Sequence, residues 1–444
     1  MSLTTPESIR TLQRKLYVKA KQQPACRFHA LYDKLYRADI LSHAWRRVLA
    51  NKGNPGIDGI DFAAIENGMG VESYLLDLGR ELKDKTYRAS PVARVLIPKA
   101  DGSKRPLGIP TIRDRVVQMA LKLVMEPIFE ADFCAHSYGF RPKKSAHEAM
   151  DAIADALRHG HTQVIDADLS NYFDSIPHAK LLATVAERVV DGAVLALIKQ
   201  WLKAPVMSGN ESGKTACVGG GKGSRRGTPQ GGVISPLLSN IYLHLMDRIW
   251  QRHELARKLQ ARLVRYADDF VVMCRNDATP PLSIIRSILG RLDLELNEGK
   301  TKIVDAANEG FCFLGFSVKM NVASKGVSYP HIKPSDKAVV KVKSRLREIT
   351  ASNQTWRPID QVVRDVNRIL RGWSGYFHFG NSSAVFLKVK NQSEGRLRTH
   401  LRKRHKVKDW KASMIQFPRR VLYEKYGLYK LPTVAGWKVA HART

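Results

Sequence analysis

Two adjacent aspartates, Asp268 and Asp269, stand between two apolar stretches of strand length in the segment Arg265–Met273. The pattern predicts a strand pair over Leu263–Cys274 with the aspartates at the turn. Carboxylates buried in or beside a strand pair are costly unless a cation or basic group compensates their charge, and a divalent metal ion is the natural compensator. Because Asp is also common in turns for local reasons, this segment alone fits a metal site and an ordinary turn equally well.

A metal site at this hairpin needs a further carboxylate, because adjacent residues of a strand point to opposite faces. The predicted strand Thr162–Leu169 carries Asp166 and Asp168 on one face, and either of them could project towards the hairpin. Two Mg²⁺ ions held by such carboxylates are a known device for in-line phosphoryl transfer. Asp174, by contrast, shortly precedes Pro177 and fits an N-terminal cap of the following helix.

The rest of the chain mixes helices and strands without a regular βαβ rhythm. A hairpin is predicted from strand Arg94–Ile97, a turn at 100–103 and strand Arg105–Pro110. Arg113–Glu126 has helical periodicity and is expected to end at Pro127. Further helices are predicted over 179–190, 193–203, 236–251, 281–292, 335–349 and 359–373. The mixture predicts the α+β class rather than a doubly wound sheet.

Net charge limits the partners of the chain. The 73 Lys and Arg residues against 41 Asp and Glu residues leave a formal charge of +32, so nucleic acid is the first expected partner. No stretch approaches the length of about eighteen apolar residues that a membrane span requires, and the polar start lacks the apolar core of a secretory signal. We therefore expect an intracellular protein, whose five scattered cysteines are reduced thiols.

The positive charge is concentrated towards the C-terminus. Residues 331–444 hold 26 basic against 7 acidic residues, a net charge of +19, whereas the first 330 residues carry the other +13. This distribution predicts a mixed-charge body and a strongly basic C-terminal unit, with a boundary between 318 and 334. The predicted helix over 359–373 has an apolar stripe with Arg364, Arg368 and Arg371 outside it, so one face packs and the other is cationic.

A series of motifs, in order along the chain, resembles the reverse transcriptase/maturases encoded by bacterial group II introns. The motifs are similar to that family's N-terminal extension (Gly53–Gly59), fingers hairpin (Ile97–Lys99 and Lys104–Arg115), first metal-binding strand (Asp168–Ile176), template and nucleotide helix (Arg226–Leu238), polymerase hairpin box (Tyr266–Asp269), primer grip (Phe313–Phe316) and maturase part with the thumb (Trp356–His405).

The resemblance implies which carboxylates hold metal. The family's aspartate in the first strand stands five residues before an aromatic residue, which selects Asp168 over Asp166. Asp168, Asp268 and Asp269, with Leu169 beside the first, would then hold two Mg²⁺ ions and make up the catalytic site.

The resemblance also implies contacts with the incoming nucleotide. Phe173 is similar to the steric gate that clashes with a ribonucleotide 2′-hydroxyl, and Gln230 to the residue that packs under the nascent base pair. Lys99 and Arg105 match the fingers residues that contact the triphosphate, a role that an ammonium and a guanidinium fork suit.

The architecture implied is a right-hand polymerase: fingers and palm over residues 1–318, with an antiparallel sheet flanked by helices, and then a helical thumb/maturase domain over 319–415. Residues 416–444 form a candidate DNA-binding segment. We expect no endonuclease domain, because the paired cysteines that such a domain needs do not occur in this sequence. The thumb/maturase residues expected to contact RNA are Lys341, Arg345, Arg364, Arg368, Arg371, Arg402, Lys403 and Arg404.

The expected function is RNA-directed DNA synthesis that copies intron RNA, together with binding of that RNA to assist its splicing. Expected partners are group II intron RNA, a DNA primer or target and deoxynucleoside triphosphates, in the bacterial cytoplasm and without a membrane or a stable protein partner. A splicing cofactor with little polymerase activity is one alternative, against which the presence of all three carboxylates argues. Another is a CRISPR-associated, retron or diversity-generating reverse transcriptase; the maturase-like segment speaks against the last two.

Overall fold

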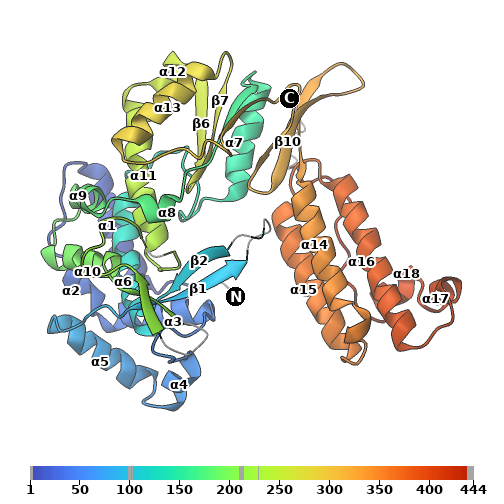
Figure 1. Cartoon of the computed structure of the whole chain (residues 1–444), viewed down its shortest axis with the longest axis horizontal. Coiled ribbons are helices and arrows are strands. Elements are labelled where there is room, and N and C mark those ends of the chain that lie inside the picture. The colour runs from blue at the N-terminus through green and yellow to red at the C-terminus, as the bar shows by residue number, and fades with distance from the viewer. Residues whose placement is uncertain (1–3, 99–101, 103, 210–214, 229, 438–444) are drawn as a thin grey trace. The chain divides into compact units, whose positions relative to one another are not determined.

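The computed structural model describes residues 4–98, 102, 104–209, 215–228 and 230–437 (Figure 1). Lys99 lies outside the described residues. The chain divides into two compact units: the first comprises Met1–Ser145, Ala167–Val271 and Thr279–Thr301, and the second comprises Ala146–Asp166, Val272–Ala278 and Lys302–Thr444.

Helices make up most of the start of the first unit. They are α1 (Glu7–Gln22), α2 (Tyr32–Leu35), α3 (Ala38–Ala50), α4 (Phe62–Asn67), α5 (Val71–Lys83) and α6 (Ile112–Glu130). Both α1 and α3 pack against α6, whose side chains are buried on nearly every face. A helix that is apolar all round is expected at the centre of a core, and α6 takes that place.

Helix α6 corrects the expectation that Pro127 ends it, because the helix continues to Glu130. A proline inside a helix removes the hydrogen bond to the carbonyl four residues earlier. That carbonyl belongs to Leu123, and the Gln13 side chain of α1 donates to it through Nε2 at 2.9 Å. A contact from a distant segment thus replaces the lost backbone bond, which local sequence rules do not foresee.

A four-stranded sheet in the order β2-β1-β4-β5 carries the predicted hairpin. Strands β1 (Val92–Pro98) and β2 (Lys104–Ile109) pair antiparallel in a continuous register. Strand β4 (Val206–Gly209) runs parallel to β1, and β5 (Thr215–Gly219) returns antiparallel to β4.

A second four-stranded sheet has the order β6-β7-β3-β8. Its strands are β3 (Gln163–Ala167), β6 (Ala261–Tyr266), β7 (Asp269–Cys274) and β8 (Lys302–Asp305), and β3 pairs antiparallel with β8. The helices that follow β3 and β6 in sequence are α8 (Tyr172–Ser175), α9 (His178–Ala186), α10 (Gly192–Leu202), α11 (Ser235–Arg252), α12 (Leu255–Lys258) and α13 (Thr279–Arg291). The mixture of helices and antiparallel strand pairs confirms the α+β class.

The second unit contains α7 (Ala146–Arg158), a three-stranded sheet and a helical bundle. The sheet has the order β11-β10-β9, formed by β9 (Phe311–Phe313), β10 (Phe316–Val322) and β11 (Ser328–Pro334). The bundle comprises α14 (Asp336–Ile349), η1 (Ser352–Gln354), α15 (Ile359–Phe377), α16 (Ser383–Arg404), α17 (Trp410–Gln416) and α18 (Arg419–Glu424). Helices α14, α15 and α16 lie side by side (Figure 1) around an apolar core.

The chain after α18 returns to the bundle and packs on it. Leu428 and Leu431 are buried in the bundle core. Further on, the Gly436 amide donates to the Gly380 carbonyl at 2.9 Å. Apolar burial and backbone pairing together fix this segment to its own unit, a placement that its basic composition alone did not predict.

Candidate active site

The two aspartates of the hairpin occupy different positions in it. Ala267 and Asp268 form the turn, whereas Asp269 is the first residue of β7. The Ala267 φ of 58° is in the left-handed region, which is uncommon for a residue with a side chain. Asp268 is half-buried and Asp269 is exposed. Asp268 therefore lies in the predicted turn, and Asp269 lies directly after it, at the start of the second strand.

Asp168 lies just beyond the end of β3 and is tied to the chain after α13. Its carbonyl accepts a hydrogen bond from the Asn297 amide at 2.8 Å, and its Oδ2 lies 2.8 Å from the Lys300 Nζ. The buried neighbour Leu169 forms an isolated antiparallel bridge with Leu296. Sequence reasoning missed Lys300, because nothing in the local pattern distinguishes it from the many other lysines of the chain.

Electrostatics connect Asp168 with the hairpin turn. Burial raises the pKa of Asp268, and the nearby Asp168 carboxylate raises it further, while Arg105 and Arg265 oppose the shift. A carboxyl group whose charged form is disfavoured by burial and by a nearby carboxylate is in an unfavourable position unless a cation compensates its charge. The donor set is therefore chemically suited to a hard divalent cation, which prefers carboxylate oxygens. Within the described residues, however, no group of three or more His, Cys, Asp or Glu side chains is close enough to hold a metal ion.

The predicted nucleotide contacts that the structure describes lie on β2, on helix α8 and in the turn before α11, all in the first unit. Arg105 is exposed on β2, and its Nε donates to the Gln230 Oε1 at 2.9 Å. The Gln230 carbonyl in turn accepts from the Gly108 amide at 2.5 Å, and the Phe173 carbonyl accepts from the Thr228 amide at 2.7 Å. These bonds bring Arg105, Gln230 and Phe173 into one connected region.

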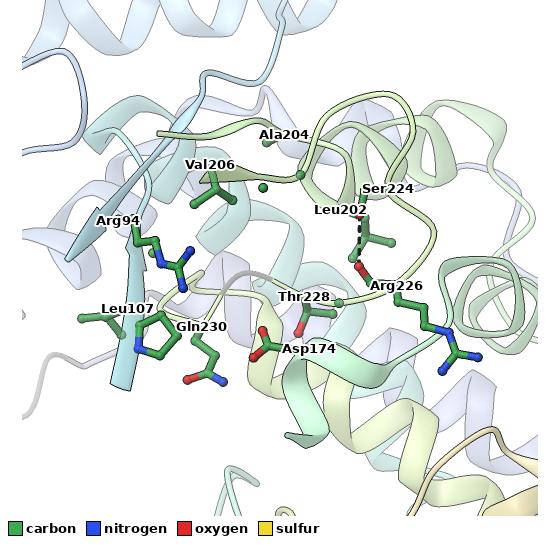
Figure 2. Close-up of a pocket in the computed structure, with 15 residues that line it drawn as sticks. Arg94, Leu107, Asp174, Leu202, Ala204, Val206, Ser224, Arg226, Thr228 and Gln230 are labelled. Atoms are coloured by element: carbon green, nitrogen blue, oxygen red, sulfur yellow. Dashed lines mark hydrogen bonds between the residues drawn. The ribbon is translucent and has the colours of Figure 1, made fainter. Parts of the chain in front are cut away.

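A pocket of about 230 Å³ lies beside this region (Figure 2). Arg94, Asp174, Thr228 and Gln230 contribute its polar lining. Desolvation of its carboxyl raises the pKa of Asp174, opposed by Arg94 and then Arg105. The expected capping role of Asp174 is wrong, because α9 begins at His178 behind Pro177 and has no side-chain cap. The Asp174 side chain points into the pocket instead.

The predicted RNA contacts fall on the helical bundle. Lys341, Arg345, Arg364, Arg368, Arg371 and Lys403 are exposed, whereas Arg402 and Arg404 are half-buried. Arg404 donates through Nη1 to the Thr355 and Arg357 carbonyls at 2.7 and 2.6 Å. Arg404 therefore anchors the loop between α14 and α15 as well as contributing charge.

Comparison with known proteins gives two family matches. Residues 97–318 match "Reverse transcriptase (RNA-dependent DNA polymerase)", and residues 339–416 match "Group II intron, maturase-specific domain". The matched families place the chain in the class of nucleic-acid polymerases.

Individual relatives point the same way. The chain is 36% identical to "Protein YkfC" of Escherichia coli (strain K12), over 69% of this chain and 87% of the relative. It is 28% identical to "Uncharacterized 91 kDa protein in cob intron" of Schizosaccharomyces pombe, over 80% of this chain and 51% of the relative. It is 36% identical to "Group II intron-encoded protein LtrA" of Lactococcus lactis subsp. cremoris, over 50% of this chain and 35% of the relative.

The chain belongs to the group II intron family of reverse transcriptases, with the family's polymerase region and maturase-specific domain in one polypeptide. The right-hand polymerase class and the RNA-directed DNA polymerase and maturase functions expected from the sequence are confirmed at the level of the family. The chain spans about half of the S. pombe relative and about a third of LtrA. Among the described residues, no helix is long and apolar enough to cross a membrane.

A solved structure titled "Partial Cas6-RT-Cas1--Cas2 complex" is similar to a smaller degree. It aligns at 19% identity with a TM-score of 0.35, over 59% of this chain and 42% of that chain. A likeness of this size supports no conclusion about the partners of the chain.

Proposed function

We propose that the chain copies group II intron RNA into DNA at a site formed by Asp168, Asp268 and Asp269, and that its helical bundle binds that RNA and assists its splicing. The observation that carries the proposal is that the Asp168 carboxylate lies near enough to the turn residue Asp268 to add to the rise that burial causes in the pKa of Asp268. Carboxyl groups with perturbed pKa values are concentrated at functional sites of proteins.

Two Mg²⁺ ions held by the three aspartates and the backbone at Leu169 would activate the 3′-oxygen of a DNA primer and stabilise the leaving pyrophosphate. The protein residues contribute placement. Lys300 holds the Asp168 carboxylate from one side, and the hairpin turn presents Asp268 from another strand.

The nucleotide would lie against Arg105, Gln230 and Phe173, with Lys99 as a further contact to its phosphates. Arg105 and Gln230 are already joined by a hydrogen bond, so the guanidinium approaches a triphosphate from a fixed direction. The Phe173 ring packs edge-on to Tyr172, at 5.6 Å between ring centroids, which restricts its movement. A restricted ring can exclude a 2′-hydroxyl, whereas a mobile ring would give way.

Intron RNA would bind to the exposed cations of the bundle. Structured RNA is held through its phosphates and its shape, which suits a spread of long basic side chains on helices. We place the protein in the cytoplasm with this RNA, its DNA primer and deoxynucleotides.

Primer extension on an RNA template tests the proposal. The wild-type chain should extend a DNA primer with deoxynucleotides and Mg²⁺, and Asp268→Asn should abolish extension while retaining salt-sensitive RNA binding. A wild-type chain that binds RNA tightly but makes no DNA would leave only the splicing role. DNA synthesis that survives in Asp268→Asn would place the catalytic carboxylates elsewhere.

A further inference from the structure

A buried arginine lies directly behind the hairpin turn. Arg265, on β6, is fully buried, and its guanidinium contacts three different groups. Its Nε donates to Asp247 Oδ1 at 3.0 Å and its Nη2 pairs with Asp247 Oδ2, while its Nη1 donates to Asn240 Oδ1 at 3.1 Å and to the Ala267 carbonyl at 3.0 Å. One side chain therefore joins helix α11, which carries Asp247 and Asn240, to the turn that carries Asp268.

The ion pair at this position is complete and entirely buried. Burial alone would raise the pKa of Asp247, but the Arg265 guanidinium and His136 hold it well below the usual carboxyl range. His136 Nε2 lies 3.2 Å from Asp247 Oδ1. A buried ion pair gives little net stability compared with apolar side chains of the same size. Stabilisation of the core therefore does not by itself explain why β6 carries an arginine here.

A second segment of the chain also contacts the turn. The Gly139 backbone lies so close to the turn that a Cβ at this position would collide with the Ala267 amide and the Tyr266 carbonyl carbon. The Asn240 Nδ2 donates to the Gly139 carbonyl at 2.7 Å, and the Tyr138 amide donates to the Arg265 carbonyl at 2.8 Å. Asn240 thus contacts both Arg265 and the Gly139 backbone that lies against the turn.

These contacts explain the unusual backbone of Ala267. A left-handed conformation in a residue other than glycine costs about 1 kcal/mol or more and persists only where its surroundings fix it. The Arg265 bond to the Ala267 carbonyl is one such restraint, and the close approach of Gly139 is another. Asp268 follows Ala267 directly, so the direction of its carboxylate depends on this conformation.

We propose that Arg265 is a positioning residue for the reaction: through the Ala267 carbonyl it fixes the turn so that the Asp268 carboxylate faces Asp168 before a divalent cation binds. The inference rests on the proposed function of the aspartates and adds a residue to it. Arg265 touches neither substrate nor cation in this role. Outer contacts that orient a metal ligand typically contribute 10- to 100-fold to metal affinity.

The test compares two conservative variants of buried arginines. Arg265→Lys keeps the charge but cannot reach Asp247, Asn240 and the Ala267 carbonyl together. Arg188→Lys is the matched control, because Arg188 is also buried and binds Asp132 and four backbone carbonyls elsewhere in the same unit. Mn²⁺ binding to each full-length protein, without substrates, is measured by electron paramagnetic resonance, alongside thermal unfolding.

We expect Arg265→Lys to weaken Mn²⁺ binding about 10-fold or more and to raise the Mg²⁺ concentration that primer extension requires by a similar factor. The KM for deoxynucleotides should change little. Arg188→Lys should lower the unfolding temperature and leave Mn²⁺ affinity unchanged. If Arg265→Lys fails to fold, Asn240→Ala removes one partner of the guanidinium and should weaken Mn²⁺ binding in the same direction.

The outcomes separate this inference from the proposed function. Asp268→Asn serves as the reference: if it binds Mn²⁺ as well as the wild type does, the assignment of the metal site itself is wrong. If Asp268→Asn loses Mn²⁺ while both the Arg265 and the Asn240 variants bind it normally, Arg265 serves the fold alone and the positioning role is overturned.

Discussion

The hairpin turn and the helical bundle both bear charges that the proposed function uses, but the charges of the turn are held in place whereas those of the bundle are exposed. Behind the turn, Arg265 and Asp247 are fully buried, and the hydrogen bond between them fixes the orientation of both charged groups. On the bundle, Lys341 and Arg364 are exposed and extend from helix surfaces. Chemistry depends on the placement of a few atoms, so it needs a rigid surrounding. Binding to phosphates depends on the sum of many charges, so it tolerates mobile ones.

The largest expected difference between the two regions is in DNA synthesis. Asp168→Asn removes a carboxylate from the proposed metal site and should lower the rate of primer extension by at least about 10³-fold, equivalent to about 4 kcal/mol. The control is Asp365→Asn in α15, which also removes a carboxylate that pairs with basic side chains, here Arg357 and Arg368. We expect this control to retain synthesis within a few-fold. Equal losses in both variants would show that overall charge, rather than the site, determines the rate.

A buried histidine near the ion pair behind the turn gives the next largest effect, on stability. Burial, opposed by Asp247, lowers the pKa of His244 to about 4. The unfolded chain takes up a proton at this residue as the pH falls below about 6.5, whereas the folded chain resists it down to about 4, so stability is lost over that range. The loss amounts to about 3 kcal/mol by pH 4.

His244→Gln should remove this part of the pH dependence, so that the free energy of unfolding falls less between pH 6.5 and 4 than in the wild type. Denaturant unfolding at several pH values measures it. His253→Gln, one residue past the end of the same helix and exposed, is the control and should leave the slope as it is. If His244→Gln shows the same pH dependence of the free energy of unfolding as the wild type, burial does not lower the pKa of His244 in the folded protein.

The C-terminal segment that packs on the bundle has a position, Gly436, at which there is no space for a side chain. A Cβ at Gly436 would collide with the Phe379 amide and the His378 carbonyl. We therefore expect Gly436→Ala to destabilise the second unit by about 2 kcal/mol, measured by denaturant unfolding. Gly395→Ala is the control: it has open space inside α16, so it should be neutral or stabilise by up to about 1 kcal/mol. If Gly436→Ala is as stable as the wild type, the segment is only loosely attached.

Local sequence patterns predict the hairpin of the proposed active site well, but they do not predict the contacts that support it. The strand pair with Asp268 at the turn follows from apolar runs of strand length, which are a local signal. Nothing local shows that Arg265 reaches Asn240 and Asp247, because 25 and 18 residues separate it from them in the chain. Local patterns miss the continuation of α6 through Pro127 for the same reason, because Gln13 lies 110 residues from the carbonyl to which it donates a hydrogen bond. Asp174 shows a different error: a local rule predicted that it caps the next helix, whereas tertiary packing directs its side chain into the pocket.

The choice of metal ligands needed a different kind of information. Strand alternation placed Asp166 and Asp168 on one face and left both possible, and only the resemblance to a family selected Asp168. In the structure, Asp166 lies within β3, opposite Lys302 of β8, whereas Asp168 lies past the strand end. The position at which a strand stops therefore distinguishes the two aspartates, and strand ends are poorly defined by sequence patterns.

The smallest expected effect concerns single cations of the bundle. Arg364→Gln should weaken RNA binding only a few-fold and reduce the slope of log affinity against log salt by about 0.7 to 0.9, the loss of one phosphate contact. Arg404→Gln should do more, because Arg404 also holds the Thr355 and Arg357 carbonyls in the loop between α14 and α15. Filter binding across a salt series, with unfolding measured in parallel, separates the two effects: Arg364→Gln changes RNA binding but not the stability of the protein, and Arg404→Gln changes both. An Arg364→Gln variant that lost most of its RNA affinity at every salt concentration would show that this arginine makes a specific contact. The bundle would then depend, as the hairpin turn does, on the exact position of a single side chain.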